Sequence, residues 1–232
     1  MLHNRGRALF LILILGLAAC LAAPPAPGLS PIDAAKGILS DEFSPANPAW
    51  ALFDTAEGAA YAQQGELYLE DRGQGVGIYT RLIDYTWEDT VVAVQVRQVE
   101  GTQNNWMGVT CRQQDEENYY LFAISADGYY LIMKVEDGLR SKLAGPVLSP
   151  VITPGRETNR LEVRCEGTRL SLSVNGQLLA TRTDVSFGAG SIALFADAAE
   201  VGSTTTAAFD AFSISDPREQ EVQTDEVATR NP

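Results

Sequence analysis

Short runs of alternating apolar and polar residues recur along most of the chain, each bounded by Gly, Asp, Asn or Pro. A period of two residues is typical of a β-strand with one buried face. The pattern predicts strands at 65–70, 76–81, 90–98, 106–113, 118–125, 129–135, 159–166, 169–174, 177–182, 190–196 and 205–214. Helical periodicity is hard to find after the first apolar run, so we expect an all-β protein.

Two dipeptides between these runs carry strong turn chemistry. Asn175-Gly176 separates two apolar runs, and this pair is the strongest short signal for a β-hairpin. Asp127-Gly128 lies between two further runs and gives nearly as good a signal. Many strands, tight turns and the lack of crossover helices predict an antiparallel two-sheet sandwich.

The alternation also assigns faces to two cysteines. Cys111 shares the apolar side of 106–113, and Cys165 shares the apolar side of 159–166. Both side chains should therefore point into the core. In an oxidising compartment such a pair favours a disulfide, with two buried free thiols as the alternative.

The start of the chain has the features of a secretory signal peptide. A basic stretch with Arg5 and Arg7 precedes a short apolar run that ends at Cys20. The run Leu17-Ala18-Ala19-Cys20 resembles the bacterial lipobox, whose cysteine is lipidated. An uncleaved transmembrane helix is the alternative, although the run is short for a span of about 20 residues.

This interpretation divides the chain into four parts and predicts a location. They are a signal peptide (1–19), a lipidated cysteine with an Ala/Pro-rich spacer (20–37), the β-sandwich (38–216) and a disordered acidic tail (217–232). The protein is then expected in the cell envelope, extracytoplasmic and attached to a membrane through its N-terminal lipid.

Charge and histidine content exclude several kinds of function. The formal net charge is −13, and it becomes about −15 when Arg5 and Arg7 leave with the signal peptide. Such an acidic chain repels phosphate backbones, so nucleic acid is not expected as a partner. The single histidine, His3, also lies in the signal peptide. The mature chain therefore has no imidazole for a Ser-His-Asp triad, a general base or a zinc site.

The stretch from Asp41 to Asp216 resembles the concanavalin A-like lectin/glucanase superfamily, in particular its laminin-G-like and 3-keto-disaccharide-hydrolase-like branches. The residues that carry the resemblance are Gly108-Val109, Cys111-Arg112, Asn118-Tyr119-Tyr120-Leu121-Phe122, Asp127-Gly128-Tyr129-Tyr130, Lys134, Asn159, Cys165, Gly167, Val174-Asn175-Gly176, Asp184, Gly190 and Phe209-Asp210-Ala211-Phe212. The resemblance implies a jelly-roll sandwich whose concave sheet receives sugar or peptide. Most of this pattern is core and turn chemistry, so it specifies function poorly.

The resemblance also raises the question of glycosidase activity. Glucanase members carry carboxylates on one strand in the spacing E-x-D-x-x-E, and this sequence lacks that spacing. The densest acidic cluster, Asp115-Glu116-Glu117, falls between two predicted strands, where acidic residues are usually just solvated. No catalytic residue is therefore predicted.

Candidate ligand residues lie on the strand face opposite the cysteines. Trp106 and Arg112 fall on the outward side of 106–113. Neighbouring strands offer Tyr119 or Tyr120 and Tyr129 or Tyr130, and Tyr119 and Tyr129 are taken as the candidates. Aromatic faces stack on sugar rings, and Arg binds hydroxyl or carboxylate groups. The alternative is that these aromatics are ordinary half-buried strand residues, with Trp106 a plug under a loop.

No cofactor or metal site is predicted, although the laminin-G-like resemblance leaves calcium open. The acidic residues that could serve, Asp127, Asp137 and Asp197, all fall in turns, where Asp is common for backbone reasons alone.

The sequence thus favours a membrane-anchored recognition module that binds a polysaccharide, a cell-envelope glycan or another envelope partner, and it favours binding over catalysis. A glycoside hydrolase of the 3-keto-disaccharide type is one alternative. A structural envelope lipoprotein is the other.

Overall fold

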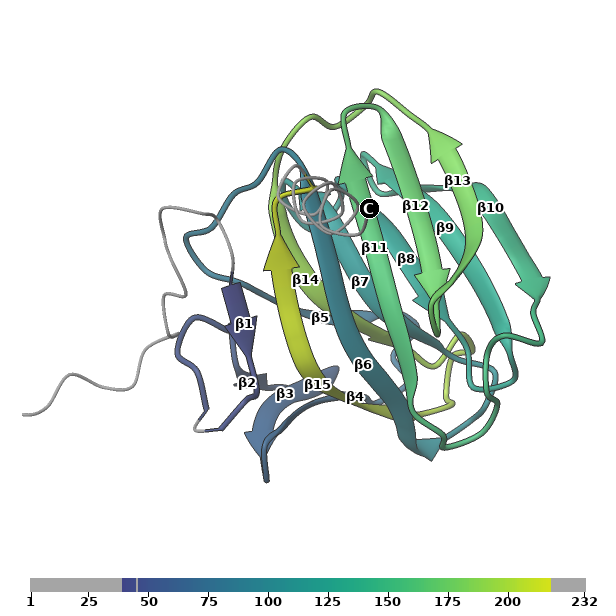
Figure 1. Ribbon diagram of the computed structural model, residues 1–232. Helices are drawn as coiled ribbons and strands as arrows, with labels where there is room; N and C mark the ends of the chain where they lie inside the picture. The colour runs from purple at the N-terminus through teal and green to yellow at the C-terminus, as the bar shows by residue number, and fades with distance from the viewer. Residues whose placement is uncertain (1–38, 45, 218–232) are drawn as a thin grey trace, which may run out of the picture.

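The computed structural model describes residues 39–44 and 46–217, which form two antiparallel β-sheets with a shared core (Figure 1). The larger sheet contains β1 (Leu39–Asp41), β2 (Phe53–Asp54), β3 (Gly58–Gln63), β4 (Glu66–Asp71), β6 (Thr90–Gly101), β11 (Asn159–Glu166), β12 (Arg169–Val174), β13 (Gln177–Thr183) and β15 (Thr205–Ser215). The smaller sheet contains β5 (Ile78–Arg81), β7 (Trp106–Gln113), β8 (Tyr119–Ile124), β9 (Tyr129–Glu136), β10 (Leu139–Leu148) and β14 (Ser191–Asp197).

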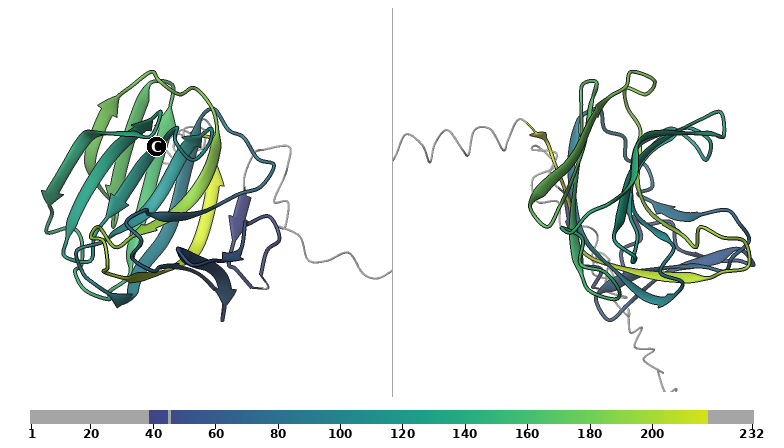
Figure 2. Two further views of the ribbon diagram at one scale, coloured as in Figure 1. Left: turned by 180° about the vertical axis from the view of Figure 1, so that it is seen from behind. Right: turned by 90° about the vertical axis from the view of Figure 1, so that its right-hand side faces the viewer.

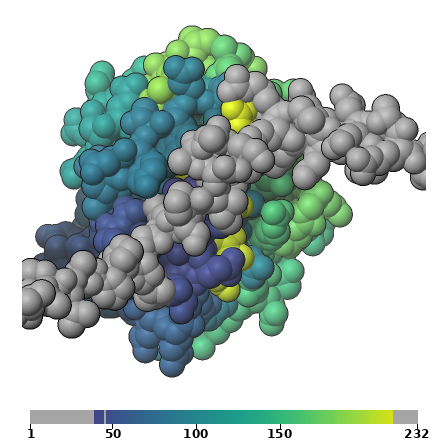
Figure 3. All heavy atoms as spheres, turned by 60° about the vertical axis from the view of Figure 1, so that its left-hand side comes forward, coloured from purple at the N-terminus to yellow at the C-terminus, as the bar shows by residue number. Residues whose placement is uncertain are grey.

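The strand order differs from the chain order in both sheets. The nine-stranded sheet runs β13-β12-β11-β6-β15-β4-β3-β2, with β1 paired to β15, and the six-stranded sheet runs β10-β9-β8-β7-β14-β5. Residues near 40 thus lie against the last strand of the domain, and in Figure 3 purple and yellow atoms meet on one side of the molecule. The expected all-β, antiparallel two-sheet sandwich is confirmed.

Each of the eleven predicted runs corresponds to a strand, whereas β1, β2, β3 and β10 were not predicted. Strand β3 is rich in alanine, which has a low preference for strands. Strand β10 contains Gly145-Pro146 and pairs with β9 through two register shifts. Proline and bulges are tolerated at a sheet edge, and they erase the alternation that a sequence pattern needs.

The core lies between the sheets and contains the predicted disulfide. Cys111 of β7 and Cys165 of β11 are fully buried and bonded, with their Cα atoms 6.8 Å apart. Because β7 and β11 belong to different sheets, the bond fastens one sheet to the other. The predicted pairing and the inward direction of both cysteines are confirmed.

Both predicted hairpins are present. Asn175 and Gly176 connect β12 to β13 with φ values of 50° and 80°, as a tight turn with two left-handed residues requires. Asp127-Gly128 connects β8 to β9, and Gly128 has a φ of 96°. The second of these turns fixes the register of β8 and β9, which carry Tyr119 and Tyr129.

The predicted signal peptide 1–19, the lipidated Cys20, the spacer 20–37 and, apart from Pro217, the predicted tail 217–232 lie outside the described residues. Within the part of the chain that is described, no helix has the length and apolarity needed to span a membrane.

Candidate functional site

The outer faces of the two sheets differ in chemistry. On the nine-stranded sheet, charged side chains are paired with one another, as in the Arg97–Glu66 ion pair at 2.6 Å and the Arg164–Glu162 pair at 3.1 Å. The charged groups on this face are satisfied by water and by ion pairs with one another. One solvated face and one buried face is the usual arrangement of an antiparallel sheet.

The outer face of the six-stranded sheet is apolar instead. A second cluster of buried residues lies there, separate from the main core, with partly buried aromatic and Met side chains packed against it. The cluster comprises Tyr119, Leu121, Ala123, Leu131, Val135 and Phe195, and the side chains packed against it are Tyr79, Trp106 and Met133. The residues of the cluster are at most 7% exposed, so this face carries a second packed apolar layer and not an open apolar patch.

The strand register explains how this face is shaped. Across the sheet, Phe195 of β14 is opposite Gly108 of β7, Gly108 is opposite Ala123 of β8, and Ala123 is opposite Leu131 of β9. Small residues in the middle of the row leave space for the larger side chains at its sides. A Cβ at Gly108 would lie 1.9 Å from the carbonyl oxygen of Phe122, so no larger residue fits there.

A cavity of about 550 Å³ opens on this outer face. Its aromatic lining is Phe53, Tyr79 and Tyr119, and its charged lining is Glu57, Glu116, Glu117 and Arg140. These residues come from four separate parts of the chain: the β2–β3 turn and its preceding strand, β5, the β7–β8 connection with β8, and β10. Figure 2 (right) shows connections projecting beyond the curved six-stranded sheet on this side. We call this cavity the outer groove.

The ionisation of the lining residues gives the outer groove both donors and acceptors. Burial, then the charge and hydrogen bond of Glu116, raise the pKa of Tyr79 to about 12, so its phenol is neutral near pH 7. Burial also raises the pKa of Tyr119. A hydrogen bond with Thr55 lowers the pKa of Glu57 and keeps that exposed carboxyl ionised. Neutral phenols beside the ionised Glu57 and the Arg140 guanidinium suit a ligand with both apolar faces and hydroxyl groups.

Three of the four predicted ligand residues share this outer face. Tyr119 lines the outer groove. Trp106 is half-buried and packs against the apolar cluster, but it does not line the cavity. Tyr129 stands at the other end of β9, 36% exposed and opposite Leu148. The structure thus places Tyr119 in the groove and the other two aromatics on the same face but toward the opposite ends of β8 and β9.

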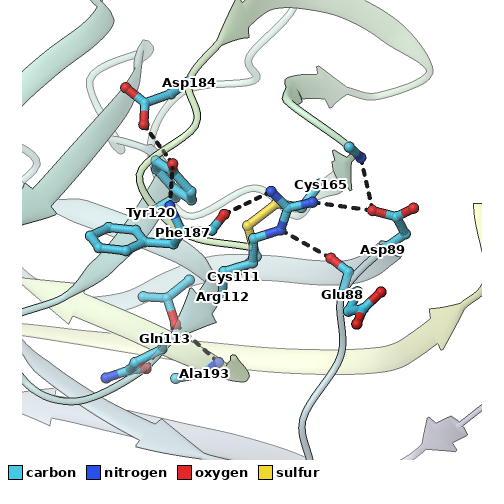
Figure 4. Close-up of a disulfide and its surroundings, with 12 residues drawn as sticks. Glu88, Asp89, Cys111, Arg112, Gln113, Tyr120, Cys165, Asp184, Phe187 and Ala193 are labelled. Carbon is cyan, nitrogen blue, oxygen red and sulfur yellow. Dashed lines mark hydrogen bonds and ion pairs between the residues drawn. A yellow bond between two sulfur atoms is a disulfide. The ribbon is translucent and has the colours of Figure 1, made fainter. Parts of the chain in front are cut away.

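Arg112 does not share that face, and the alternation that placed it beside Trp106 is wrong at this point. A register shift follows Thr110 where β7 pairs with β14, and Arg112 takes a φ of 50°. This bulge turns the side chain inward, where it is 3% exposed. Its guanidinium donates to the carbonyl oxygens of Glu88 and Phe187 at 3.0 and 2.9 Å and to the Asp89 carboxylate at 3.1 Å (Figure 4). These donors hold loops together and are not free for a ligand.

Several groove residues were missed from the sequence or given no role. Tyr79 and Arg140 were not considered, although the alternation in 76–81 already places Tyr79 and Arg81 on one face. Glu116 and Glu117 were seen as a solvated cluster, and they do lie exposed on the β7–β8 connection. The structure adds that this connection forms part of the groove lining. Only the tertiary fold brings it near β5 and β10.

The three turn aspartates considered for calcium are held in different ways, and the Asp127 carboxylate accepts a hydrogen bond from the Ser125 hydroxyl. Asp197 accepts a hydrogen bond from the Ala199 amide at 2.9 Å, and the Asp137 amide donates to the Asn118 side chain. Within residues 39–44 and 46–217, no group of three or more His, Cys, Asp or Glu side chains is arranged to hold a metal ion.

No protein-family model matches the sequence, and no curated protein matches it. Solved structures resemble the fold at low sequence identity. The GH43 protein BlXynB from Bacillus licheniformis matches with a TM-score of 0.53 and 11% identity over 76% of this chain and 39% of that one. A provisionally assigned glycosyl hydrolase from Parabacteroides distasonis matches with a TM-score of 0.51 and 13% identity over 76% and 90%. A Bacillus subtilis protein of unknown function with a galectin-like fold gives 0.51 and 13% over 72% and 89%. These similarities show the β-sandwich fold.

Proposed function

We propose that this protein is a lipid-anchored protein of the cell envelope whose β-sandwich binds a glycan in the outer groove. The observation that carries the proposal is the groove itself: a cavity of about 550 Å³ with Tyr79 and Tyr119 in its lining, next to carboxylates and Arg140. Sugar rings have apolar faces that pack on aromatic rings and hydroxyl groups that need fixed polar partners. The outer groove offers both.

The fold supports this assignment without deciding it. Two of the solved structures with this fold are described as glycosyl hydrolase-type proteins and one as galectin-like, so similar scaffolds occur in proteins that handle carbohydrate. The contrast between the two outer faces supports it further. The nine-stranded face carries paired charges, whereas the six-stranded face carries a packed apolar cluster with the outer groove beside it. The lipid anchor rests on the lipobox-like residues that end at Cys20.

The test is a glycan array probed with the purified full-length chain and three variants. Tyr79→Ala and Arg140→Met should each weaken retention by the glycans that the wild type binds. Loss of a stacked aromatic should reduce affinity by about 1 kcal/mol. Tyr61→Ala is the matched control, because Tyr61 is a half-buried tyrosine that stacks on Tyr68 at 5.2 Å and lies outside the groove. Equal retention of all four proteins would place any binding site elsewhere.

A second candidate, glycoside hydrolysis, is favoured by one observation. Carboxylates from two separate segments, Glu57 and the pair Glu116-Glu117, line one cavity. Hydrolysis needs one carboxyl with a raised pKa to act as the acid. The pKa of Glu57 is lowered through Thr55, which is the wrong direction for that role. Incubation with bound oligosaccharides should therefore release no new reducing ends. Turnover that Glu57→Gln abolishes would favour the hydrolase instead.

A further inference from the structure

A second cavity of about 530 Å³ lies beside the outer groove and shares none of its lining residues. It is bounded by Arg81 and the segment 82–86 after β5, by Gln113 and Gln114 at the end of β7, and by residues 189–191 before β14. We call it the Tyr85 cavity, after the aromatic residue that it exposes.

The two cavities follow one another along the same structural elements. Tyr79 and Arg81 alternate on β5, so they project from the same face about 7 Å apart. On the facing side, Gln113 and Gln114 line the Tyr85 cavity, and Glu116, a little further along the connection, lines the outer groove. Both walls of one cavity therefore continue into the walls of the other.

A side-chain contact marks the junction. Tyr79 and Glu116 both line the outer groove, and after burial the charge of Glu116 raises the pKa of the Tyr79 phenol, so β5 and the β7–β8 connection lie close together here. Arg81 is close enough for its charge to act on the same phenol. The hydroxyl groups of a bound glycan can form hydrogen bonds with Tyr79, Glu116 and Arg81, because each of these side chains has several hydrogen-bond donors or acceptors.

Tyr85 forms a braced aromatic surface in the second cavity. Its ring stacks on Trp87 with centroids 5.4 Å apart and an angle of 9° between the planes, and 39% of the residue stays exposed. Trp87 is anchored in turn, because it packs on the main core and exchanges two backbone hydrogen bonds with Gly190 at 3.0 Å. A ring held this way pays little ordering entropy when a ligand stacks on it.

A fixed polar group completes the cavity. Gln113 is only 2% exposed, and its amide is held at both ends, by Thr110 at 2.9 Å and by the Asp115 carbonyl at 3.2 Å. Because both ends of this amide are engaged, Gln113 fixes the cavity wall, and the polar groups open to a ligand are those of the exposed Arg81 and Gln114. Exposed polar side chains next to a braced ring are the combination that a sugar subsite uses, one for hydroxyl groups and one for a ring face.

We propose that the Tyr85 cavity is a further sugar subsite, so that the protein binds an oligosaccharide extended along β5 through both cavities. This rests on the proposed glycan-binding function and adds the length of the ligand and its path. A glycan that fills only the outer groove would leave the Tyr85 surface unused.

The experiment measures how affinity depends on the length of the glycan. The full-length chain is titrated with oligosaccharides of two to eight sugars derived from β-1,3-glucan, β-1,4-glucan, β-1,4-xylan, β-2,6-fructan and peptidoglycan. For the series that binds, wild-type affinity should rise with length. Tyr85→Ala should weaken the longest members by about 3- to 10-fold and leave the shortest unchanged. Arg81→Met should do the same, and Tyr79→Ala should weaken every length.

The possible outcomes separate the two proposals. If wild-type affinity does not change with length, or if Tyr85→Ala and Arg81→Met bind the longest members as tightly as wild type, the extended site is wrong and binding in the outer groove still stands. Equal weakening of short and long members by Tyr85→Ala would also overturn the extended site. If wild type binds no member of any series, glycan binding itself is contradicted. Tyr61→Ala serves as the control at each length.

Discussion

Replacing Arg112 by Met should destabilise the domain without a specific effect on ligand binding. The methionine side chain fills a similar volume but cannot donate a hydrogen bond. In the wild type, the buried guanidinium serves the Glu88 and Phe187 carbonyls and the Asp89 carboxylate. The variant leaves those carbonyls without this donor next to the disulfide at Cys111, in a bulge where the chain has little freedom to adjust.

The expected cost follows from these contacts. Hydrogen bonds to a charged group contribute about 1.5–3 kcal/mol each, and removing one member of a buried ionic group costs about 3–5 kcal/mol. Asp89 is 41% exposed and keeps its bond from the Gly167 amide at 2.8 Å, so water can satisfy much of its charge. The two carbonyls therefore dominate, and we expect a loss of about 3–4 kcal/mol.

Urea unfolding followed by tryptophan fluorescence measures this loss. With a typical dependence on urea, the midpoint should fall by about 1–2 M while the slope is unchanged. Arg140→Met is the matched control, since Arg140 is exposed and lines the outer groove. It should keep the wild-type midpoint and lose affinity for glycan. If Arg112→Met unfolds at the wild-type urea concentration, the buried network does not stabilise the domain as argued here.

Three further predictions follow from single contacts. Replacing Cys111 and Cys165 together by Ala should cost about 4 kcal/mol of unfolding free energy, because the bond closes a loop with a sequence separation of 54. Peptide mapping of the wild type without reductant should find these two residues joined. Burial opposes ionisation of Asp184, but hydrogen bonds from Tyr120 and Ser186 and the charge of Lys134 hold its pKa below 3.8. The ionised carboxylate therefore stabilises the folded state above pH 3.8, and this stabilisation is lost as the pH falls through the lowered pKa. Asp184→Asn should flatten this acid limb in unfolding curves measured across pH, and a limb as steep as in wild type would contradict the assignment. Cys20→Ser should abolish metabolic labelling with fatty acid, and continued labelling would refute the lipid site.

The sheet architecture could be predicted from the sequence because the inner faces keep a period of two. Runs such as 106–113, 159–166 and 169–174 match the observed strands residue for residue. The disulfide followed from the same rule, since alternation alone turned Cys111 and Cys165 inward. Strand β10 could not be found, because Gly145-Pro146 and two register shifts interrupt its pattern.

The candidate site was only partly predictable, for a physical reason. Alternation says which residues share a face of one strand, but it left open whether Tyr119 or Tyr120 points outward, and the structure places Tyr119 on the outer face and Tyr120 in the core. It assumes a regular strand, however, and one bulge at Arg112 was enough to send that side chain into a buried network. The outer groove also depends on which distant segments meet, as Glu57, Tyr79 and Arg140 do, and no local pattern contains that information.

The position of a bound oligosaccharide in a crystal structure of the full-length chain tests the central claim most directly. Crystals would be grown with the glycan that the array retains most strongly. The proposed function predicts sugar rings in the outer groove, over Tyr79 and Tyr119 and within hydrogen-bonding distance of Glu116 or Arg140. Sugar bound to the charged outer face of the nine-stranded sheet, with the outer groove empty, would contradict it.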